Sequence, residues 1–419
     1  MKTSLLSLRH SFIVAAVLSV VSIVSASDNE ALHWNRIATA TTGRVHPLNP
    51  FDESRILAVV HLAMHDAANS VAPRFATYAP APAEKLGGSA DASVASAAYT
   101  ALRELMPEHT AGLETEFETR THLVADAAER DRGIAAGRRA ANQILALRKN
   151  DGAANAVSWP AGKLPGQYRP TPPDLTPAVF SHWGSVRPFA LSSSKQFRPI
   201  APPSIGSAQA IADIEEVRTV GGATSARRTF EQSEIACYWY EASTQGWNRI
   251  AREVGTTRGL DLWENARLLA LVNVAMADGY VGVMEAKYHY NYWRPATAIR
   301  ERGESGWLSF LPTPPVPDYP SGHTVLGAAA ATAMARCLGT DYVSFTMTSG
   351  QPYPNISRRF WSLSQAAQEN GASRVFAGIH FTTAVQAGYR QGMEIGGWAA
   401  GTILRPLGEK PVFTLVAQP

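Results

Sequence analysis

Apolar residues recur at helical spacing along most of this chain. Between 51 and 69 they fall every three or four positions, as on the buried face of an amphipathic helix: Ile56, Val59, Val60, Ala63, Met64 and Ala67. Similar patterns predict helices over 92–105, 110–130 and 131–149, so we expect an N-terminal helical half over residues 27–156.

Proline interrupts this periodicity between residues 157 and 205. The ten prolines of that stretch exclude long helices, because proline lacks a backbone donor and clashes with the preceding turn. The segment nevertheless has large aromatic side chains to bury: Trp159, Tyr168, Phe180, Trp183, Phe189 and Phe197. We therefore predict an irregular excursion that wraps over the body or over a site entrance. A disordered linker is the alternative.

Helical patterns resume in the second half, residues 206–419. They cover 207–220, 229–240, 243–254, 262–290, 321–338, 357–376 and 382–400. No run of alternating residues predicts a sheet, so the predicted fold class is all-α, with two helical halves.

The first 26 residues have the features of a secretory signal peptide. Lys2 and Arg9 precede an apolar run over 12–24. Small residues then lead to a predicted cleavage point after Ala26. The alternative, a membrane anchor, requires about 20 apolar residues. We expect an exported protein, periplasmic or extracellular, whose mature form begins near Ser27 and is not embedded in a membrane.

Charge and cysteine content set two further limits. Removal of Lys2 and Arg9 from 38 basic residues leaves 36 against 35 acidic ones, and a formal charge near +1 favours no nucleic-acid partner. Cys237 and Cys337 are compatible with a disulfide or with two separate thiols. The oligomeric state stays open.

Two cations stand seven residues apart in the segment 287–295. Seven residues make two helical turns, which would put Lys287 and Arg294 on one face of a helix that Pro295 ends. A solvated charged face is the alternative. The surrounding aromatic residues favour an enclosed face, where cations need a counter-anion: Tyr288, Tyr290, Tyr292 and Trp293.

A second segment has the features of an anion cradle. Ser321, Gly322 and His323 begin a helix rich in small residues, and the unpaired N–H groups of a helix N-terminus attract anions. The alternative is that Ser321 only caps the helix and His323 is a surface histidine.

A third segment pairs Arg374 with His380 in apolar surroundings, where a lone histidine is more often a satisfied core residue than a catalyst. Taken with the two earlier segments, it completes a set of two arginines, one lysine, a helix N-terminus and two histidines. A trianionic tetrahedral oxyanion, phosphate or vanadate, requires such a set.

The three segments resemble the signature of the type 2 phosphatidic acid phosphatase and vanadium haloperoxidase superfamily. The resemblance rests on Lys287 with Arg294-Pro295, on Pro320-Ser321-Gly322-His323, and on Ser373-Arg374 with His380. The neighbourhoods 286–295 and 317–320 are similar to the soluble bacterial haloperoxidase branch. That likeness implies two four-helix bundles, with the oxyanion at the end of the second.

The resemblance also implies a role for each group. Lys287, Arg294 and Arg374 would neutralise the equatorial oxygens. Ser321 and the Gly322 amide would donate hydrogen bonds to them. His323 would be the general acid and base, and His380 either the axial ligand of vanadate or a nucleophile that becomes phosphohistidine.

Two positions depart from the family pattern. Many members have an aspartate four residues after the second histidine, but this chain has Ala384. His380 must then be oriented by a backbone carbonyl or another side chain. Where halide-oxidising relatives often carry an aromatic residue or a histidine, this chain has Val316.

Three functions are compatible with this pocket. The first is a vanadate-dependent haloperoxidase-like oxidoreductase that uses hydrogen peroxide to oxidise halide or a related nucleophile. The second is a secreted acid phosphatase without a cofactor, with phosphate ester as substrate and phosphate as product. The third is a non-catalytic phosphate-binding protein, which Ala384 favours.

A metal site at His61, His65 and Asp66 is also conceivable, because the histidines lie one helical turn apart. The segment lacks the glutamate arrangement of a zinc protease, so hydrogen bonding between helices is the better interpretation.

Export gives a first testable prediction. Mature protein from the periplasm or medium should begin near Ser27, because Val24 and Ala26 form the small-residue cleavage pattern. N-terminal sequencing measures this directly. An extracytoplasmic chain that still begins at Met1 would contradict it.

Overall fold

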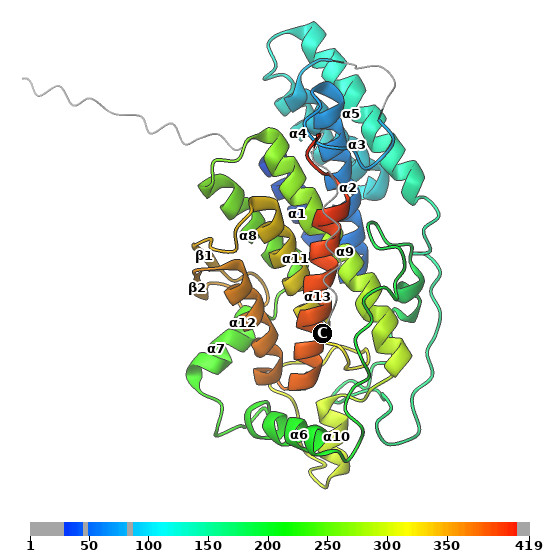
Figure 1. Cartoon of the computed structure of the whole chain (residues 1–419), viewed down its shortest axis with the longest axis vertical. Helices are drawn as coiled ribbons and strands as arrows, with labels where there is room; N and C mark the ends of the chain where they lie inside the picture. Colours follow the sequence, from blue (N-terminus) through cyan, green and yellow to red (C-terminus); the bar gives the residue numbers. More distant parts are fainter. Residues whose placement is uncertain (1–28, 45–48, 82–86, 409–419) are drawn as a thin grey trace, which may run out of the picture.

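A computed structural model describes residues 29–44, 49–81 and 87–408, so the predicted signal peptide 1–26 lies outside the described residues. The described chain is mostly helical (Figure 1). Its α-helices are α1 (Glu30–Arg44), α2 (Pro50–Val71), α3 (Ala90–Leu105), α4 (Thr110–Thr121), α5 (Ala127–Arg148), α6 (Ala208–Val220), α7 (Phe230–Tyr238), α8 (Ser243–Thr257), α9 (Leu262–Tyr290), α10 (Pro295–Glu301), α11 (Gly322–Leu338), α12 (Leu363–Phe376) and α13 (Thr382–Thr402). Two short 3-10 helices, η1 (Pro107–His109) and η2 (Ser181–Ser185), and two strands, β1 (Phe345–Thr348) and β2 (Ser357–Phe360), complete it.

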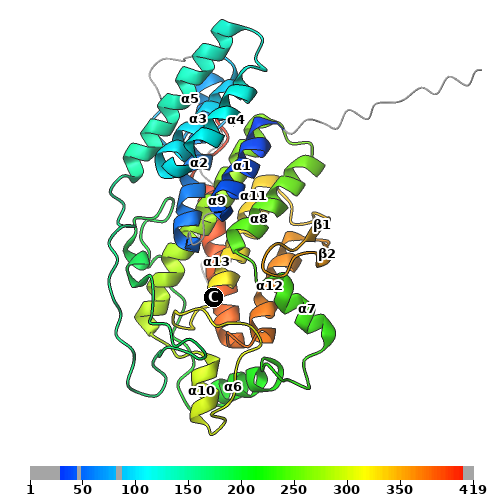
Figure 2. The same ribbon diagram turned by 180° about the vertical axis from the view of Figure 1, so that it is seen from behind.

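Helix α9 runs through the middle of the molecule and joins two helical bundles. It contacts α2 of the first bundle, which also contains α3 and α5, and α11 of the second, which also contains α12 and α13. In both views α3, α4 and α5 lie at one end of the molecule and α6 and α10 at the other (Figures 1 and 2). The all-α, two-bundle prediction is confirmed.

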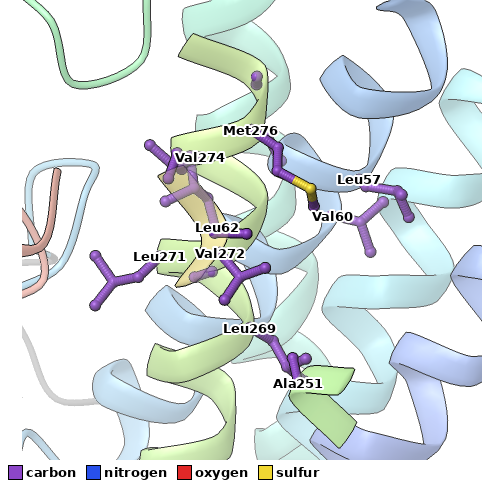
Figure 3. Close-up of a cluster of buried hydrophobic side chains, with 14 of the residues drawn as sticks. Leu57, Val60, Leu62, Ala251, Leu269, Leu271, Val272, Val274 and Met276 are labelled. Atoms are coloured by element: carbon purple, nitrogen blue, oxygen red, sulfur yellow. The ribbon is translucent and has the colours of Figure 1, made fainter. Parts of the chain in front are cut away.

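Part of the core lies where α2, α8 and α9 meet. Leu57, Leu269 and Met276 are fully buried there, and Figure 3 shows Leu269 beside Ala251 of α8. Burial of such a side chain stabilises the fold by roughly 1.5–3 kcal/mol. Among the described residues α9 is the one helix long and apolar enough to cross a membrane, and 94% of its most apolar window is buried inside the protein.

Helices α11 and α13 approach each other unusually closely at glycines of α13. A Cβ at Gly392 would lie 2.3 Å from the Val325 carbonyl oxygen, and one at Gly388 would lie 2.7 Å from that of Ser321. Only glycine fits at such a contact. These two positions therefore hold the N-terminus of α11 against the start of α13.

The proline-rich segment 157–205 is irregular apart from η2 and is anchored to α9. The fully buried Asp278 carboxylate accepts N–H bonds from Phe189, Ala190 and Leu191, at 2.6, 2.7 and 2.9 Å. Further along, the hydroxyls of three tyrosines donate to carbonyl oxygens of the segment: Tyr288 to Val179, Tyr290 to Pro199 and Tyr319 to Ile200. The excursion is thus bound to the body by polar contacts at several points.

Several predicted helix boundaries were wrong. The helix expected over 110–130 ends at Thr121, and α5 begins after Asp126, whose carboxylate caps it by accepting from the Glu129 N–H. Helices α1 and α10 were not predicted. The start of the helix expected over 357–376 is instead strand β2, which pairs antiparallel with β1. Strands of four residues are too short to show a clear alternation.

The two cysteines do not pair. Cys237 on α7 and Cys337 on α11 are both free thiols, partly buried. Of the two possibilities left open by the sequence, separate thiols is the one observed.

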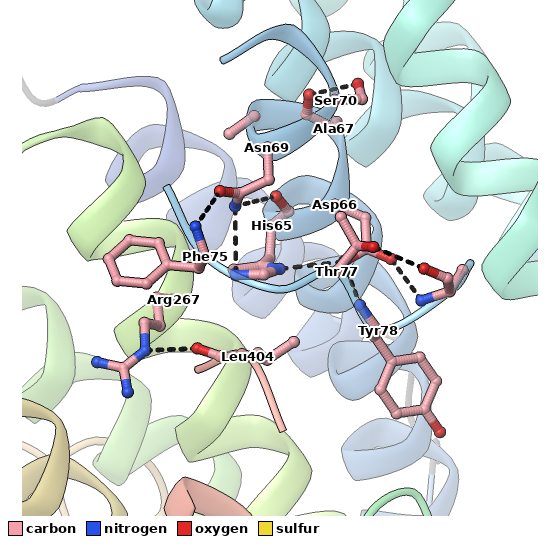
Figure 4. A network of polar contacts seen from close by, with 12 residues as sticks. His65, Asp66, Ala67, Asn69, Ser70, Phe75, Thr77, Tyr78, Arg267 and Leu404 are labelled. Carbon is pink, nitrogen blue, oxygen red and sulfur yellow. Dashed lines mark hydrogen bonds and ion pairs between the residues drawn. The ribbon is translucent and has the colours of Figure 1, made fainter. Parts of the chain in front are cut away.

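The two histidines of α2 have different polar partners. His61 Nδ1 donates to the Leu57 carbonyl oxygen at 2.6 Å, whereas His65 Nδ1 lies 3.0 Å from Asp66 Oδ1. The Asp66 carboxylate in turn accepts hydrogen bonds from the N–H groups of Tyr78 and Ala79 (Figure 4). Over the described ranges, no three His, Cys, Asp or Glu side chains are grouped to hold a metal ion.

The anchor at Asp278 gives a stability prediction. Asp278→Ala should lower the free energy of unfolding by about 3 kcal/mol, because three buried N–H groups lose their acceptor. Urea unfolding measures this, and proteolysis within 157–205 should become faster. Asp174→Ala, at an exposed aspartate of the same segment, is the control. Equal unfolding midpoints for the two variants would show that the anchor contributes nothing.

Candidate oxyanion site

The structure brings the predicted site residues together at the N-terminus of α11. Lys287 comes from the end of α9, Arg294 from the turn before α10, and Arg374 from the last turn of α12. These three cations are 2%, 1% and 1% exposed. Enclosure of three like charges at one place is the main electrostatic feature of the molecule.

Lys287 points at the loop that leads into α11. Its Nζ donates to the carbonyl oxygens of Pro317 and Asp318, at 2.7 and 2.8 Å. Burial, reinforced by the nearby Arg294 charge, holds the pKa of Lys287 well below its usual value. An anion beside this ammonium would favour its charged form.

The sequence pattern predicted that Lys287 and Arg294 lie on one helix, and this prediction was wrong. Helix α9 ends at Tyr290, because Asn291 takes a left-handed conformation with φ +48°. Arg294 follows in extended backbone as the N-cap residue of α10. Its Nε donates to the Val316 carbonyl oxygen at 2.8 Å and its Nη1 to that of Ile379 at 2.7 Å, so the guanidinium still reaches the site.

Arg374 has a donor with no partner. Its Nη2 donates to the Trp239 carbonyl oxygen at 2.8 Å and its Nε to Ser373 Oγ at 2.9 Å, whereas Nη1 is buried without a hydrogen bond. Burial lowers its pKa to about 10. The Tyr240 ring lies over the guanidinium, with 5.8 Å between Arg374 Cζ and the ring centroid. A buried cationic donor of this kind is what an oxyanion would satisfy.

The turn before α11 presents further donors. Ser321 occupies the N-cap position without capping, and its Oγ accepts from Thr324 Oγ1 at 2.8 Å, so its own proton is free to donate. A Cβ at Gly322 would meet only Lys287 Cε, at 3.8 Å, so the lysine side chain passes directly beside this turn. The Ser321 side chain therefore does not cap the helix, and its hydroxyl is available to a ligand.

His323 lies deep among protein atoms although part of its ring is accessible. Its Nε2 donates to the Glu241 carbonyl oxygen at 3.2 Å, which assigns the proton of the neutral ring to Nε2. Burial, with Arg374 nearby, lowers the pKa of His323 to about 3. The ring is thus neutral near pH 7, and its Nδ1 has the lone pair that a general base needs.

His380 is buried beside Arg294 and Asp318. Its Nε2 lies 3.1 Å from Arg294 Nη1, and its Nδ1 lies 2.8 Å from Asp318 Oδ1. Burial and the neighbouring cations, first of all Arg294, hold the pKa of His380 well below its usual value. The histidine therefore faces the cation cluster as a neutral ring, not as an isolated core residue.

Asp318 is the site residue whose importance the sequence did not reveal. It is fully buried, and burial raises the pKa of its carboxyl to about 7, against the opposing effects of Arg294 and Lys287. Arg294 Nη1 lies 3.8 Å from its Oδ1. Two signals in the sequence were available: an acidic residue three positions before Ser321, and the absence of a carboxylate at Ala384.

The residues present fit an oxyanion. Lys287, Arg294 and Arg374 are buried against one contacting carboxylate, Asp318, so the cluster carries excess positive charge when the cations are protonated. One donor, Arg374 Nη1, has no partner among the described residues. Ser321, Gly322, His323 and His380 lie around the same cluster, so the three predicted segments do converge.

The chain is similar to known proteins over most of its length. The family model described as "VCPO second helical-bundle domain" matches residues 267–408, the part that contains all of these side chains. A curated relative, the vanadium chloroperoxidase of Curvularia inaequalis, is 25% identical over 85% of this chain and 79% of its own length.

Solved structures show the same fold. A bacterial vanadium-dependent iodoperoxidase superposes with a TM-score of 0.79 at 24% identity, over 91% of this chain and 98% of the other. The holo form of a bacterial vanadium-dependent chloroperoxidase superposes with a TM-score of 0.70 at 18% identity, over 89% and 97%.

The unpartnered arginine gives a binding prediction. Arg374→Met, which keeps much of the side-chain volume and removes the charge, should weaken binding of phosphate and orthovanadate by about 100-fold, the equivalent of about 3 kcal/mol. Isothermal titration calorimetry on the full chain measures this. Arg138→Met, at an exposed arginine of α5, is the control. Unchanged affinity in Arg374→Met would remove this arginine from the site.

Proposed function

Because the chain belongs to the vanadium haloperoxidase and type 2 phosphatidic acid phosphatase superfamily, we propose that it is a vanadate-dependent haloperoxidase-like enzyme. It would oxidise halide or a related nucleophile with hydrogen peroxide. The observation that carries the proposal is the cluster of Lys287, Arg294 and Arg374 around a neutral His380, within a fold shared with vanadium haloperoxidases along most of the chain.

Each residue of the cluster has a defined part in holding vanadate. Lys287, Arg294 and the free Nη1 of Arg374 would neutralise its oxygens, and Ser321 and the Gly322 amide would donate hydrogen bonds. His380 would bind the vanadium atom through Nε2. Bound vanadate would supply the activation of peroxide, chemistry that the side chains cannot perform alone.

His323 would move protons at this site. Its Nε2 is engaged by the Glu241 carbonyl oxygen, so proton transfer would use Nδ1. The low pKa of His323 keeps this nitrogen free to accept a proton from a peroxide or water molecule at neutral pH. An anion beside Arg374 would offset the positive charge that lowers this pKa, and would thereby strengthen His323 as a base.

An acid phosphatase on the same residues is the second candidate. Phosphate and vanadate share charge and shape, and a histidine ring held beside a carboxylate, as His380 is beside Asp318, is also typical of a nucleophile. His380 Nε2 would then attack phosphorus and the bond to the ester oxygen would break. The leaving oxygen would take its proton from His323, which would first have to be protonated on Nδ1 in the anion-bound state. The non-catalytic alternative was based on Ala384, and the Asp318 carboxylate beside His380 weighs against it.

Export remains part of the proposal. It rests on the signal-peptide pattern of residues 1–26, which lie outside the described part of the chain. A periplasmic or extracellular site would place the enzyme with small-molecule substrates, peroxide and halide, that need no carrier.

Two assays on one preparation separate the candidates. Purified protein incubated with orthovanadate should oxidise bromide or iodide in a peroxide-dependent reaction, and should hydrolyse a simple phosphate monoester little or not at all. His380→Ala should lower halide oxidation at least about 100-fold, because the ligand to the central atom is lost. Phosphate binding should persist in part, because the cations remain.

His122→Ala, at an exposed histidine after α4, serves as the control and should leave the activity unchanged. Phosphatase activity alone, abolished by orthovanadate, would favour the second candidate. Full halide oxidation by His380→Ala would refute the mechanism.

A further inference from the structure

The orientation of His380 depends on very few neighbours. The side-chain contacts of its ring are with Arg294 Nη1, at 3.1 Å from Nε2 and 3.5 Å from Nδ1, and with Asp318 Oδ1, at 2.8 Å from Nδ1. A guanidinium can only donate, whereas a carboxylate oxygen can accept. Asp318 is therefore the contact that can hold a proton on Nδ1 and leave the Nε2 lone pair facing the cations.

Asp318 is itself held firmly. Its backbone N–H donates to the Tyr292 carbonyl oxygen at 2.9 Å, and its own carbonyl oxygen accepts from Lys287 Nζ at 2.8 Å. The side chain is 0% exposed. The backbone that carries this carboxylate is thus fixed against the same elements that supply Lys287 and Arg294.

Neither carboxylate oxygen of Asp318 has a well-aligned hydrogen bond, although the Phe381 N–H lies close enough to lower the pKa of the carboxyl. Poor satisfaction of a buried acceptor is unfavourable. His380 Nδ1 is already at hydrogen-bond distance, so a small rotation of the ring would align its N–H with Oδ1. This hydrogen bond would satisfy both the Nδ1–H of His380 and the Oδ1 of Asp318.

The residue at position 384 cannot accept a hydrogen bond from His380 Nδ1 through its side chain. Ala384 is fully buried in the first turn of α13, and its carbonyl oxygen accepts the Ser321 N–H at 3.0 Å. Its backbone links α13 to the anion turn, and its side chain has no acceptor.

We propose that Asp318 is the positioning residue for His380, and that it fixes the Nδ1–H tautomer and the direction of Nε2 from the loop before α11. The proposal rests on the assignment of His380 as ligand or nucleophile under the proposed function. It predicts a tautomer that can be measured before any anion is bound.

The test is side-chain ¹⁵N NMR of histidine in the full chain without vanadate, with the His380 signals assigned from a His380→Gln variant. Wild type should carry the His380 proton on Nδ1. Asp318→Leu, which keeps the volume and removes the acceptor, should lose this preference and bind orthovanadate and phosphate about 10–100-fold more weakly. Asp318→Asn retains an acceptor oxygen and should preserve the tautomer.

Asp66→Asn is the matched control. Asp66 is a buried aspartate of α2 whose Oδ1 lies 3.0 Å from His65 Nδ1, so it stands beside a histidine that is not part of the cation cluster. This variant should leave the His380 signals unchanged.

Two results would overturn the proposal: a wild-type His380 proton on Nε2, or an unchanged tautomer and anion affinity in Asp318→Leu. Because the NMR and phosphate measurements need no turnover, absence of halide oxidation would count against the proposed function and not against Asp318. If Asp318→Leu fails to fold, a changed tautomer in Asp318→Asn, where an acceptor remains, would contradict the proposal instead.

Discussion

Burial of three cations at one end of a helical bundle is the constraint on which the rest of this structure depends. Lys287, Arg294 and Arg374 are almost inaccessible to water, and one carboxylate, that of Asp318, lies against them. Charges removed from water are costly unless they are paired. Backbone carbonyl oxygens supply part of the compensation, and the remaining positive potential would favour the binding of an anion.

The fold provides the rigidity that such a cluster requires. Glycines of α13 let α11 approach closely, and this contact fixes the turn at Ser321. The irregular segment 157–205 is tied to α9 by Asp278 and by tyrosine hydroxyls that belong to the same stretch as Lys287. The aromatic residues around the first motif therefore have two uses. They enclose the cations, and they bind the excursion to the body.

Local patterns in the sequence predicted much of this. The helices with long apolar periodicity, α2, α9, α11 and α13, were found close to their observed ends, and the three motifs converge as expected. What failed depends on contacts between distant residues. The position of Arg294 off the helix follows from the left-handed Asn291, and the importance of Asp318 becomes visible only when His380, 62 positions later, lies 2.8 Å away. Neither spacing nor propensity encodes such a contact.

The arrangement of the oxyanion site indicates the shape and charge of its ligand more clearly than it indicates the reaction. A tetrahedral oxyanion would satisfy the cations, the unpartnered Nη1 of Arg374 and the serine hydroxyl whether the central atom is vanadium or phosphorus. A haloperoxidase and a phosphatase would differ in the reaction that takes place between the bound oxyanion, His323 and His380. Both histidines are held neutral by burial and by the same cations, so one electrostatic arrangement would prepare both for the proposed reaction.

A crystal structure of the protein soaked with orthovanadate tests the central claim most directly. The account predicts one vanadium atom bonded to His380 Nε2, with its oxygens contacted by Lys287, Arg294 and Arg374 at the N-terminus of α11. Vanadate bound elsewhere, or bound with His380 turned away from it, would contradict the account.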